Sequence, residues 1–177
     1  MCRFIAIVIA AVLTSYSTFA AFFGIFSTEW WTGAVNVGIA TACNSTANLD
    51  GQSYCNDFSL DTLSNSTEQA MFGLLVASII VGLLALIVMV FNIIFACCCI
   101  NLAGPFTGLL VFLQGACILA TILTMGFYYS WSYPAGTSSI GAAYIVNIVA
   151  VPLSWVATAL TGVHHYSQNG RDEEIKA

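Results

Sequence analysis

Hydrophobic residues fill four long runs of this chain, and polar residues gather between the first two runs and at both ends. The runs cover about residues 4–26, 70–96, 106–128 and 140–163. Each run can cross a bilayer, because a helix rises about 1.5 Å per residue and the hydrocarbon core is about 30 Å thick. A span must satisfy its own backbone hydrogen bonds, so we expect helices. The pattern predicts an all-α membrane protein, with residues 1–166 forming a four-transmembrane-helix bundle.

Charged residues are scarce, which supports membrane embedding. They make up 6% of the 177 residues, whereas soluble domains carry roughly 25%. No Asp, Glu, Lys or Arg lies between Arg3 and Glu29, and none lies between Glu68 and Arg171. Three basic residues form no cluster, which argues against nucleic acid as a partner. We expect the partners to be the lipid bilayer and other membrane proteins, in the same membrane or a facing one.

The first run has two interpretations. Its single Arg3 and apolar centre fit a cleaved signal peptide. Its length of about 23 residues and the bulky Phe22, Phe23 and Phe26, which stand where a cleavage site needs small residues, favour a retained helix. We expect retention.

The basic residues predict the orientation of the chain. Arg3, Arg171 and Lys176 all lie near the termini, and four spans place both termini on one side of the membrane. The positive-inside rule makes that side cytoplasmic. We therefore expect an integral protein of the plasma membrane, with outside loops over residues 27–69 and 129–139. The polar residues 167–177 would form a disordered cytoplasmic tail.

The first outside loop carries acids, a strand pattern and a turn signal. Its five acids have no Lys or Arg among them: Glu29, Asp50, Asp57, Asp61 and Glu68. Alternation of Val35, Val37 and Ile39 predicts a strand over residues 34–43. Asp50-Gly51 is a hairpin signal, and a returning strand would begin at Tyr54.

Two cysteines and two glycosylation sequons lie in the same loop. Cys43 and Cys55 would sit on neighbouring strands in an oxidising compartment, so we expect a disulfide rather than two free thiols. Closing a loop of this length stabilises the folded state by about 3 kcal/mol in the chain-entropy model. Asn44 and Asn65 begin sequons, and Asn44 is the better acceptor because Asn65 lies close to the second span. The complete fold prediction is a four-helix bundle with a small disulfide-stapled extracellular β-sheet.

Uncharged polar residues repeat every seven positions in the last two runs. They form a stripe of six: Thr107, Gln114, Thr121, Asn147, Ser154 and Thr161. Such residues favour helix packing through hydrogen bonds between helices, although a polar pore is an alternative. In the second run, Ser78 and Gly82 have the spacing that permits close helix approach.

No catalytic residue set stands out in the sequence. Cys97, Cys98 and Cys99 end the second run, where they suit S-palmitoylation or simple burial as small apolar residues. Their spacing is not the C-x-x-C of redox or metal sites, and nucleophile, metalloprotease and phosphate-loop motifs are absent from the sequence. We therefore expect no enzyme, no cofactor and no metal.

Four spans, cytoplasmic termini and a Trp followed by two Cys in the first outside loop resemble the claudin and peripheral myelin protein superfamily. The matching residues are Trp30 (or Trp31), Cys43 and Cys55. The resemblance implies a left-handed four-helix bundle with a small extracellular antiparallel sheet stapled by the disulfide. The chain differs from the family before the first Cys, where Ala40-Thr41-Ala42 replaces Gly-Leu-Trp. The segment from Trp to Cys is also shorter than in the family.

The resemblance implies two functions. The first is cell–cell adhesion or a junctional barrier through the first outside loop, and the alternative is an auxiliary subunit of an ion channel, receptor or other membrane complex. A third function, a pore or transporter, comes from the polar stripe, because spans three and four would line water with Gln114 and Asn147, and it is less favoured. No carboxylate, Lys or Arg lies inside a span, although proton-coupled transport usually needs one.

Overall fold

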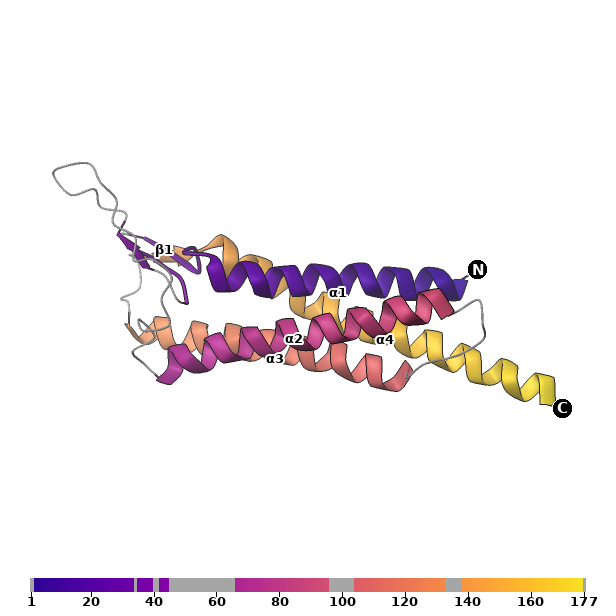
Figure 1. The fold of residues 1–177 in the computed structure, drawn as a ribbon. Coiled ribbons are helices and arrows are strands. Elements are labelled where there is room, and N and C mark those ends of the chain that lie inside the picture. The colour runs from indigo at the N-terminus through magenta and orange to yellow at the C-terminus, as the bar shows by residue number, and fades with distance from the viewer. Residues whose placement is uncertain are drawn as a thin grey trace.

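Four long helices form the body of the protein. The computed structural model describes residues 2–33, 35–39, 42–44, 66–95, 104–132 and 138–176. The helices are α1 (Cys2–Phe26), α2 (Ser66–Phe95), α3 (Gly104–Ser132) and α4 (Ala142–Lys176). Each is long and apolar enough to cross a membrane, as predicted. They lie side by side along their lengths (Figure 1).

The helices pack in sequence order around the bundle. α1 packs against α2 and α4, and α3 packs against the same two helices, so α1 and α3 face each other across a diagonal. Large apolar side chains cover the outward faces of all four helices, where lipid would contact them. The four-span membrane assignment is therefore confirmed at the level of the helices.

Local signals explain where the second and third helices begin. α2 starts at Ser66 and carries Glu68 in its first turn, where a negative charge interacts favourably with the helix dipole. α3 starts at Gly104, and Pro105 stands in its first turn, where its missing N–H costs nothing.

The last helix is longer than expected. α4 continues from the fourth span to Lys176, so the prediction of a disordered tail over residues 167–177 is wrong for the part that the structure describes. The segment after Val163 contains no proline and ends in residues that favour helices, among them Glu173, Glu174 and Lys176. Asn169-Gly170 is a helix stop signal in this segment, but the structure continues the helix through it.

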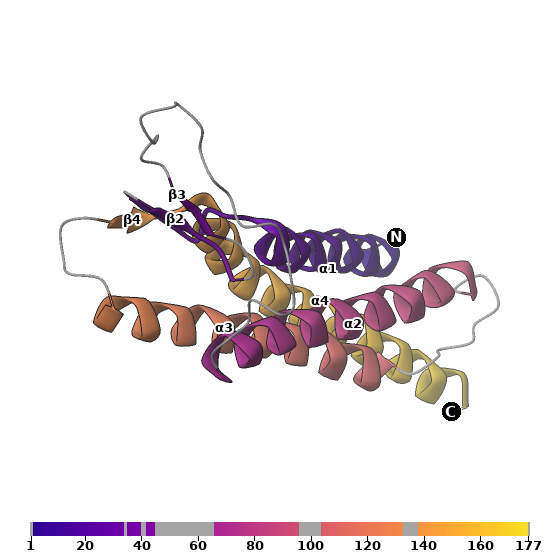
Figure 2. The same ribbon diagram turned by 60° about the vertical axis from the view of Figure 1, so that its left-hand side comes forward.

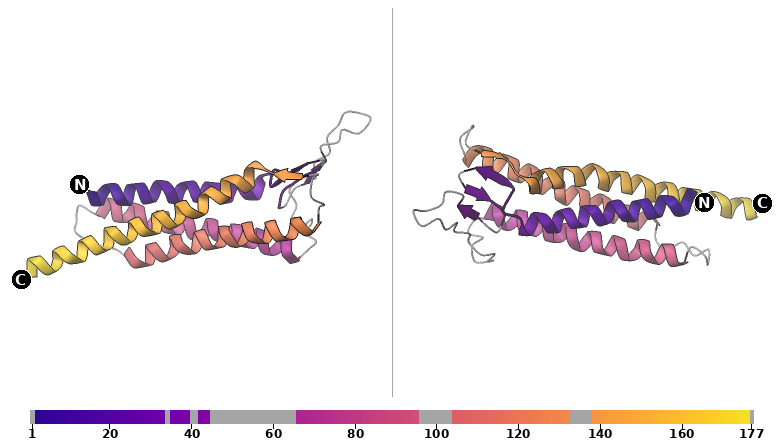
Figure 3. Two further views of the ribbon diagram at one scale, coloured as in Figure 1. Left: turned by 180° about the vertical axis from the view of Figure 1, so that it is seen from behind. Right: turned by 90° about the horizontal axis from the view of Figure 1, so that it is seen from above.

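A small antiparallel sheet stands at one end of the bundle. Its strands are β1 (Trp31–Gly33), β2 (Val35–Val37), β3 (Ala42–Asn44) and β4 (Ser138–Ile140), in the order β3-β2-β1-β4. Figure 2 shows β2, β3 and β4 together at this end. Both termini lie at the opposite end of the bundle (Figure 3).

The single strand predicted over residues 34–43 is wrong. The chain instead forms two strands that pair with each other, with Asn36 opposite Cys43. Gly38 and Ile39 lie between the strands, and Ile39 is buried against the helices instead of continuing the alternation. A strand of three residues is too short for alternation to mark its end.

The connection between α3 and α4 contributes a strand that the sequence did not predict. β4 pairs with β1, with Thr32 opposite Ser139 and Trp31 opposite Ile140. The fourth helix therefore begins at Ala142, two residues after the predicted start of the span. The sheet thus joins the segment that follows α1 to the segment that precedes α4.

The interior has two hydrophobic clusters along its length. The cluster nearer the sheet includes Trp30, Ile39 and Met71, and the cluster nearer the termini includes Ile7, Ala85 and Met89. Buried polar residues lie between them, among them Ser17 and Gln114. The four helices therefore share a polar layer near the middle of the membrane spans.

Candidate functional site

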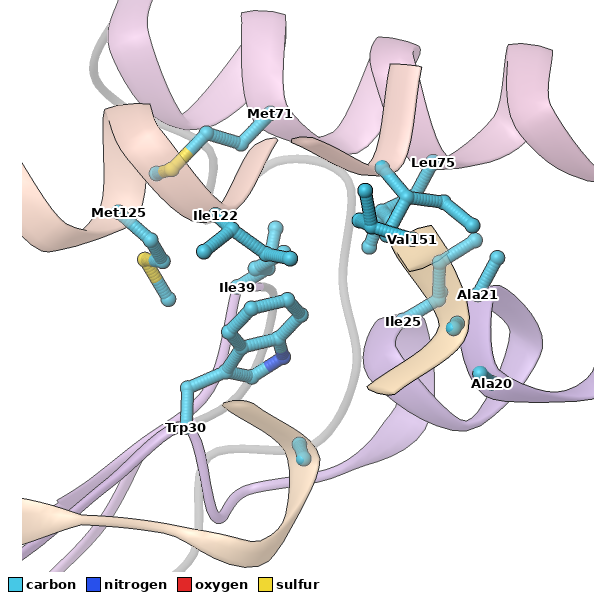
Figure 4. Close-up of a cluster of buried hydrophobic side chains, with 13 residues drawn as sticks. Ala20, Ala21, Ile25, Trp30, Ile39, Met71, Leu75, Ile122, Met125 and Val151 are labelled. Carbon is cyan, nitrogen blue, oxygen red and sulfur yellow. The ribbon is translucent and has the colours of Figure 1, made fainter. Parts of the chain in front are cut away.

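Trp30 fastens the sheet to the helix bundle. Its side chain is completely buried. Figure 4 shows the indole pointing from the start of β1 into the interior, beside Ile39 and Ile122. Tyr144 of α4 packs edge-on against it, with the ring centroids 6.1 Å apart.

The Trp30 indole also closes the end of α1. Its Nε1–H donates a hydrogen bond of 2.6 Å to the carbonyl oxygen of Gly24. This carbonyl is one of the last four of α1, which no helical N–H can reach. The Ser27 N–H donates to a second of them, the Phe23 carbonyl, at 2.9 Å. Because Gly24 has no Cβ, the indole can approach; a Cβ would lie 2.9 Å from Trp30 Cζ2.

Backbone hydrogen bonds join the segment before β1 to the start of α4. The N–H of Gly141 donates to the Trp30 carbonyl at 2.9 Å, and the N–H of Ala143 donates to the Glu29 carbonyl at 3.0 Å. The first N–H groups of a helix lack helical partners, so these two carbonyls cap α4. A Cβ on Gly141 would collide with the Glu29 carbonyl oxygen, so only glycine fits there without movement.

A side-chain pair connects β1 to β4 across the sheet. The Thr32 Oγ1 and Ser139 Oγ atoms lie 2.7 Å apart and form a hydrogen bond between β1 and β4. The two residues are 107 positions apart in the chain. Both side chains therefore point to the same face of the sheet.

The structure distinguishes the two tryptophans that the sequence leaves equivalent. Trp30 lies in the core, whereas Trp31 is half-buried and packs against Tyr144 with centroids 5.8 Å apart. Hydrophobic periodicity could not predict which tryptophan enters the core, because this depends on where α1 ends and where β1 begins.

Several predicted modification sites lie wholly or partly outside the described residues. Cys43 and Asn44 lie in β3, opposite Asn36 and Val35. Their predicted partner and companion, Cys55 and Asn65, fall outside the described residues, as do Cys97, Cys98 and Cys99. The disulfide, the glycans and the palmitoyl groups remain predictions.

All six residues of the predicted polar stripe lie in the interior of the bundle. Each side chain is at most 2% exposed. Gln114 and Ser154 bond to another helix: Gln114 Nε2–H donates to Thr18 Oγ1 at 2.8 Å, and Ser154 Oγ–H donates to Ser17 Oγ at 2.9 Å. Gln114 therefore reaches across the diagonal from α3 to α1.

Other stripe residues bond within their own helix, which corrects the expectation that the whole stripe bonds between helices. Thr121 donates to the Cys117 carbonyl at 3.0 Å, and Asn147 donates to the Ala143 carbonyl at 2.9 Å. Thr161 donates to the Thr158 carbonyl at 2.7 Å. Short side chains inside a helix reach a carbonyl of the preceding turn more easily than a neighbouring helix.

The partners of the stripe on α1 were missed by sequence reasoning. Ser17 and Thr18 interrupt the first apolar run, and that interruption is the signal that could have found them. The predicted close approach at Gly82 also belongs to this layer. A Cβ on Gly82 would collide with Gln114 Nε2 and Thr18 Oγ1.

The arrangement holds the sheet in a fixed position at one end of the bundle. Among the described residues, no group of three or more His, Cys, Asp or Glu side chains could hold a metal ion. The attachment around Trp30 and the polar layer instead fix how the sheet sits on the bundle. Comparisons with protein-family models and with curated proteins find no match for this chain.

Proposed function

We propose that the protein is a claudin-like, non-enzymatic membrane protein that acts in cell–cell adhesion or in a junctional barrier through its first outside loop. The observation that carries this proposal is the buried attachment of Trp30, which fixes a sheet built from both outside loops at one end of the bundle. A fixed surface binds a partner with a smaller loss of conformational freedom than a loose loop does.

The proposal places the sheet outside the cell and both termini in the cytoplasm, with the protein in the plasma membrane. Two features support this orientation. The termini lie at the end of the bundle opposite the sheet (Figure 3), and in the sequence Arg3 is close to the N-terminus and Arg171 is close to the C-terminus. Positive charge favours the cytoplasmic side.

The proposal includes a disulfide between Cys43 and Cys55. Cys43 lies in β3, a strand at the edge of the sheet. A bond to Cys55 would tie the following segment to this edge and would protect an edge that could otherwise pair with another chain. Glycans on Asn44 and Asn65 would lie on the same side of the membrane, and palmitoyl groups on the three consecutive cysteines would lie on the opposite side.

If the protein forms a junctional barrier, the acids of the first outside loop would determine which ions pass it. Asp50, Asp57 and Asp61 have no Lys or Arg near them in the sequence. Negative charge attracts cations, and salt screens this attraction over about 8 Å at physiological ionic strength. A seal formed by this loop would therefore favour cations over anions close to the membrane surface.

Expression in cells that lack junctions tests the proposal. When expressing cells are mixed with non-expressing cells, the protein should concentrate where two expressing cells touch. Val12→Ala, a change on the lipid-facing side of α1, is the control and should show the same enrichment. Uniform surface staining at all contacts contradicts the proposal.

The alternative is that the protein serves as an auxiliary subunit of a larger membrane complex. The exposed aromatic side chains of α3 and α4, Phe112 and Trp155, favour it because they offer a broad surface to another protein. Extraction in mild detergent would then give a complex much heavier than the 18.8 kDa chain that contains a second polypeptide. Recovery of this chain alone contradicts the alternative.

The burial of the polar stripe disfavours a pore through a single copy. Gln114 and Asn147 would line such a pore, but both are completely buried among neighbouring helices. Gln114→Leu should therefore leave flux through reconstituted vesicles unchanged. A clear change in flux would return the pore to consideration.

A further inference from the structure

The outward faces of α1 and α3 each carry an apolar band that fits the hydrocarbon core of a bilayer. We define the band as the stretch between the first and last exposed large apolar side chains of the helix, among those that the structure describes. The band runs from Phe4 to Phe26 on α1 and from Phe106 to Phe127 on α3. Each band is about 32 Å long at 1.5 Å per residue, close to the thickness of the hydrocarbon core.

Contacts with α4 fix the heights of the two helices relative to each other. The Ser154 hydroxyl donates to the Ser17 hydroxyl of α1 at 2.9 Å. On the α3 side, a Cβ added to Gly115 would lie 3.0 Å from the Ser154 Cβ. Ser17 and Gly115 therefore lie at the same height along the bundle.

Contacts seven residues away along each helix give the same alignment. A Cβ added to Gly24, seven residues after Ser17, would lie 2.9 Å from Asn147 Nδ2 of α4. A Cβ added to Gly108, seven residues before Gly115, would lie 3.2 Å from Thr161 Oγ1 of α4. The alignment of α1 with α3 thus holds over several turns.

The two apolar bands are staggered by nearly one helical turn. Phe4 lies 13 residues before Ser17, whereas Phe106 lies 9 residues before Gly115. The last residue of the α1 band lies 9 residues after Ser17, and the last residue of the α3 band lies 12 residues after Gly115. The α1 band therefore extends about 6 Å farther toward the termini, and the α3 band about 4.5 Å farther toward the sheet.

An upright bundle cannot match both bands to one flat bilayer. The α1 band would leave the hydrocarbon at the surface near the termini, and the α3 band would leave it at the surface near the sheet. Because α1 and α3 face each other across the diagonal, tilting the bundle brings both bands level. A tilt of about 10–20° suffices, since the two axes lie about 13 Å apart and the outer side chains lie farther apart.

The other two helices are compatible with such a tilt. They lie off the diagonal between α1 and α3, so a tilt along that diagonal changes their depth little. The α4 span, Ala142–Val163, is centred within two residues of Ser154. The α2 span, Ser66–Ile94, has 29 residues and is long enough to cover the hydrocarbon in either position.

We propose that the bundle lies tilted in the bilayer along the α1–α3 diagonal. The α1 side is shifted toward the membrane surface near the sheet, and the α3 side is shifted toward the surface near the termini. The partner that selects this position is the lipid hydrocarbon, which covers apolar side chains at the expense of water. Because β1 follows α1, the tilt lifts this side of the sheet away from the membrane. The proposal goes beyond the adhesive role and does not depend on it.

Depth measurements on the full chain test the proposal. A fluorescent amino acid is placed at one exposed position per protein, and the protein is reconstituted in phosphatidylcholine vesicles. Quenching by phosphatidylcholine brominated at defined acyl carbons then gives the distance of each position from the bilayer centre. Phe19 and Phe26 calibrate the method, because seven residues along α1 separate them by about 10 Å whether or not the bundle is tilted.

Two pairs of positions give opposite expectations. Val12 and Leu109 lie at nearly the same height in the molecule, 5 residues before Ser17 and 6 residues before Gly115. In a tilted bundle, Val12 lies about 5–7 Å nearer to the bilayer centre than Leu109, and the ends of the two bands near the sheet lie at equal depth. In an upright bundle, Val12 and Leu109 lie within about 2 Å of each other, and the α3 band ends about 4.5 Å farther out than the α1 band.

Matched double variants test whether the stagger causes the tilt. Phe4→Ser with Phe127→Ser shortens the two overhanging ends, so the depth difference between positions 12 and 109 should fall by more than half. Phe26→Ser with Phe106→Ser is the control, because it makes the same chemical change at the two ends that do not overhang. The depth difference should not fall in this control.

Three results would overturn the proposal. The first is equal depth for positions 12 and 109 together with a deeper position 26 than 127, which describes an upright bundle. The second is position 109 nearer to the bilayer centre than position 12, which describes the opposite tilt. The third is an equal fall in the depth difference for both double variants, or no fall for either. The experiment involves no cell contacts, so its failure would not bear on adhesion.

Discussion

At the scale of single residues, the attachment of the sheet depends on one indole and two close backbone approaches. Trp30 fills the space between the outer ends of the helices and bonds to Gly24. Gly141 brings the start of α4 against the backbone of Glu29. The sequence could identify the Trp pair as special, but not which member enters the core. It gave no signal for Gly141, because the need for glycine there arises from a residue more than one hundred positions away.

Trp30→Phe should destabilise the protein by about 1–3 kcal/mol, because it leaves the buried Gly24 carbonyl without its donor while keeping most of the aromatic volume. Thermal unfolding in detergent, followed by circular dichroism, measures the effect. Trp155→Phe is the matched control, since that indole is 42% exposed and makes no hydrogen bond among the described residues, and its unfolding midpoint should hardly change. Equal midpoints for both variants would show that the Trp30 hydrogen bond contributes nothing.

Gly141→Ala should lower the free energy of unfolding by about 1–3 kcal/mol. The new Cβ collides with the Glu29 carbonyl oxygen, and a backbone atom cannot rotate away as a side chain can. Gly162→Ala is the control, because no atom lies within 4 Å of its added Cβ. Its free energy of unfolding should rise by up to about 1 kcal/mol, because alanine favours the helix more than glycine does. The same unfolding experiment compares them. If Gly141→Ala is as stable as Gly162→Ala, α4 does not approach the 29–30 backbone as described.

At the scale of elements, the sequence predicts helices far better than strands. A helical span leaves a signal of about 20 consecutive apolar residues, so all four spans were found within a few residues of their limits. Each strand here has three residues, too few for alternation to define its ends. β4 in particular is a strand only because β1 lies beside it.

The polar layer shows a second limit at this scale. Heptad spacing found Gln114 and Ser154, which do bond to α1. It also grouped them with Thr121 and Thr161, which bond to carbonyls of their own helices. Spacing identifies the face that is buried, whereas the length of each side chain decides whether it reaches another helix.

Gly82→Ala tests whether the polar layer needs the close approach of α2. The added Cβ would collide with the Gln114 amide and the Thr18 hydroxyl, so we expect a loss of about 1–3 kcal/mol of stability. Gly73→Ala, on the same helix with no atom within 4 Å of the added Cβ, should be neutral or slightly stabilising. Unfolding midpoints in detergent compare the two variants, and a harmless Gly82→Ala would contradict the packing of this layer.

At the scale of the whole molecule, the sheet converts two separate loops into one surface. β1 and β4 come from opposite ends of the chain, yet they pair along all three of their residues. Membrane embedding and the four spans could be argued from the sequence, because each depends on composition over long stretches, and the orientation was argued from three basic residues near the termini. The pairing of β1 with β4 could not be predicted from the sequence, because it joins residues that are 107 positions apart.

The central claim, that β1 and β4 pair in one sheet in this register, is tested most directly by engineered disulfides. Thr32→Cys with Ser139→Cys places two thiols on one face of paired residues, whereas Thr32→Cys with Ile140→Cys places them on opposite faces. Peptide mass mapping of protein from membranes, after oxidation, identifies each bond. We predict efficient formation of the 32–139 bond and little of the 32–140 bond. Absence of the 32–139 bond, or equal yields of both, would contradict the account.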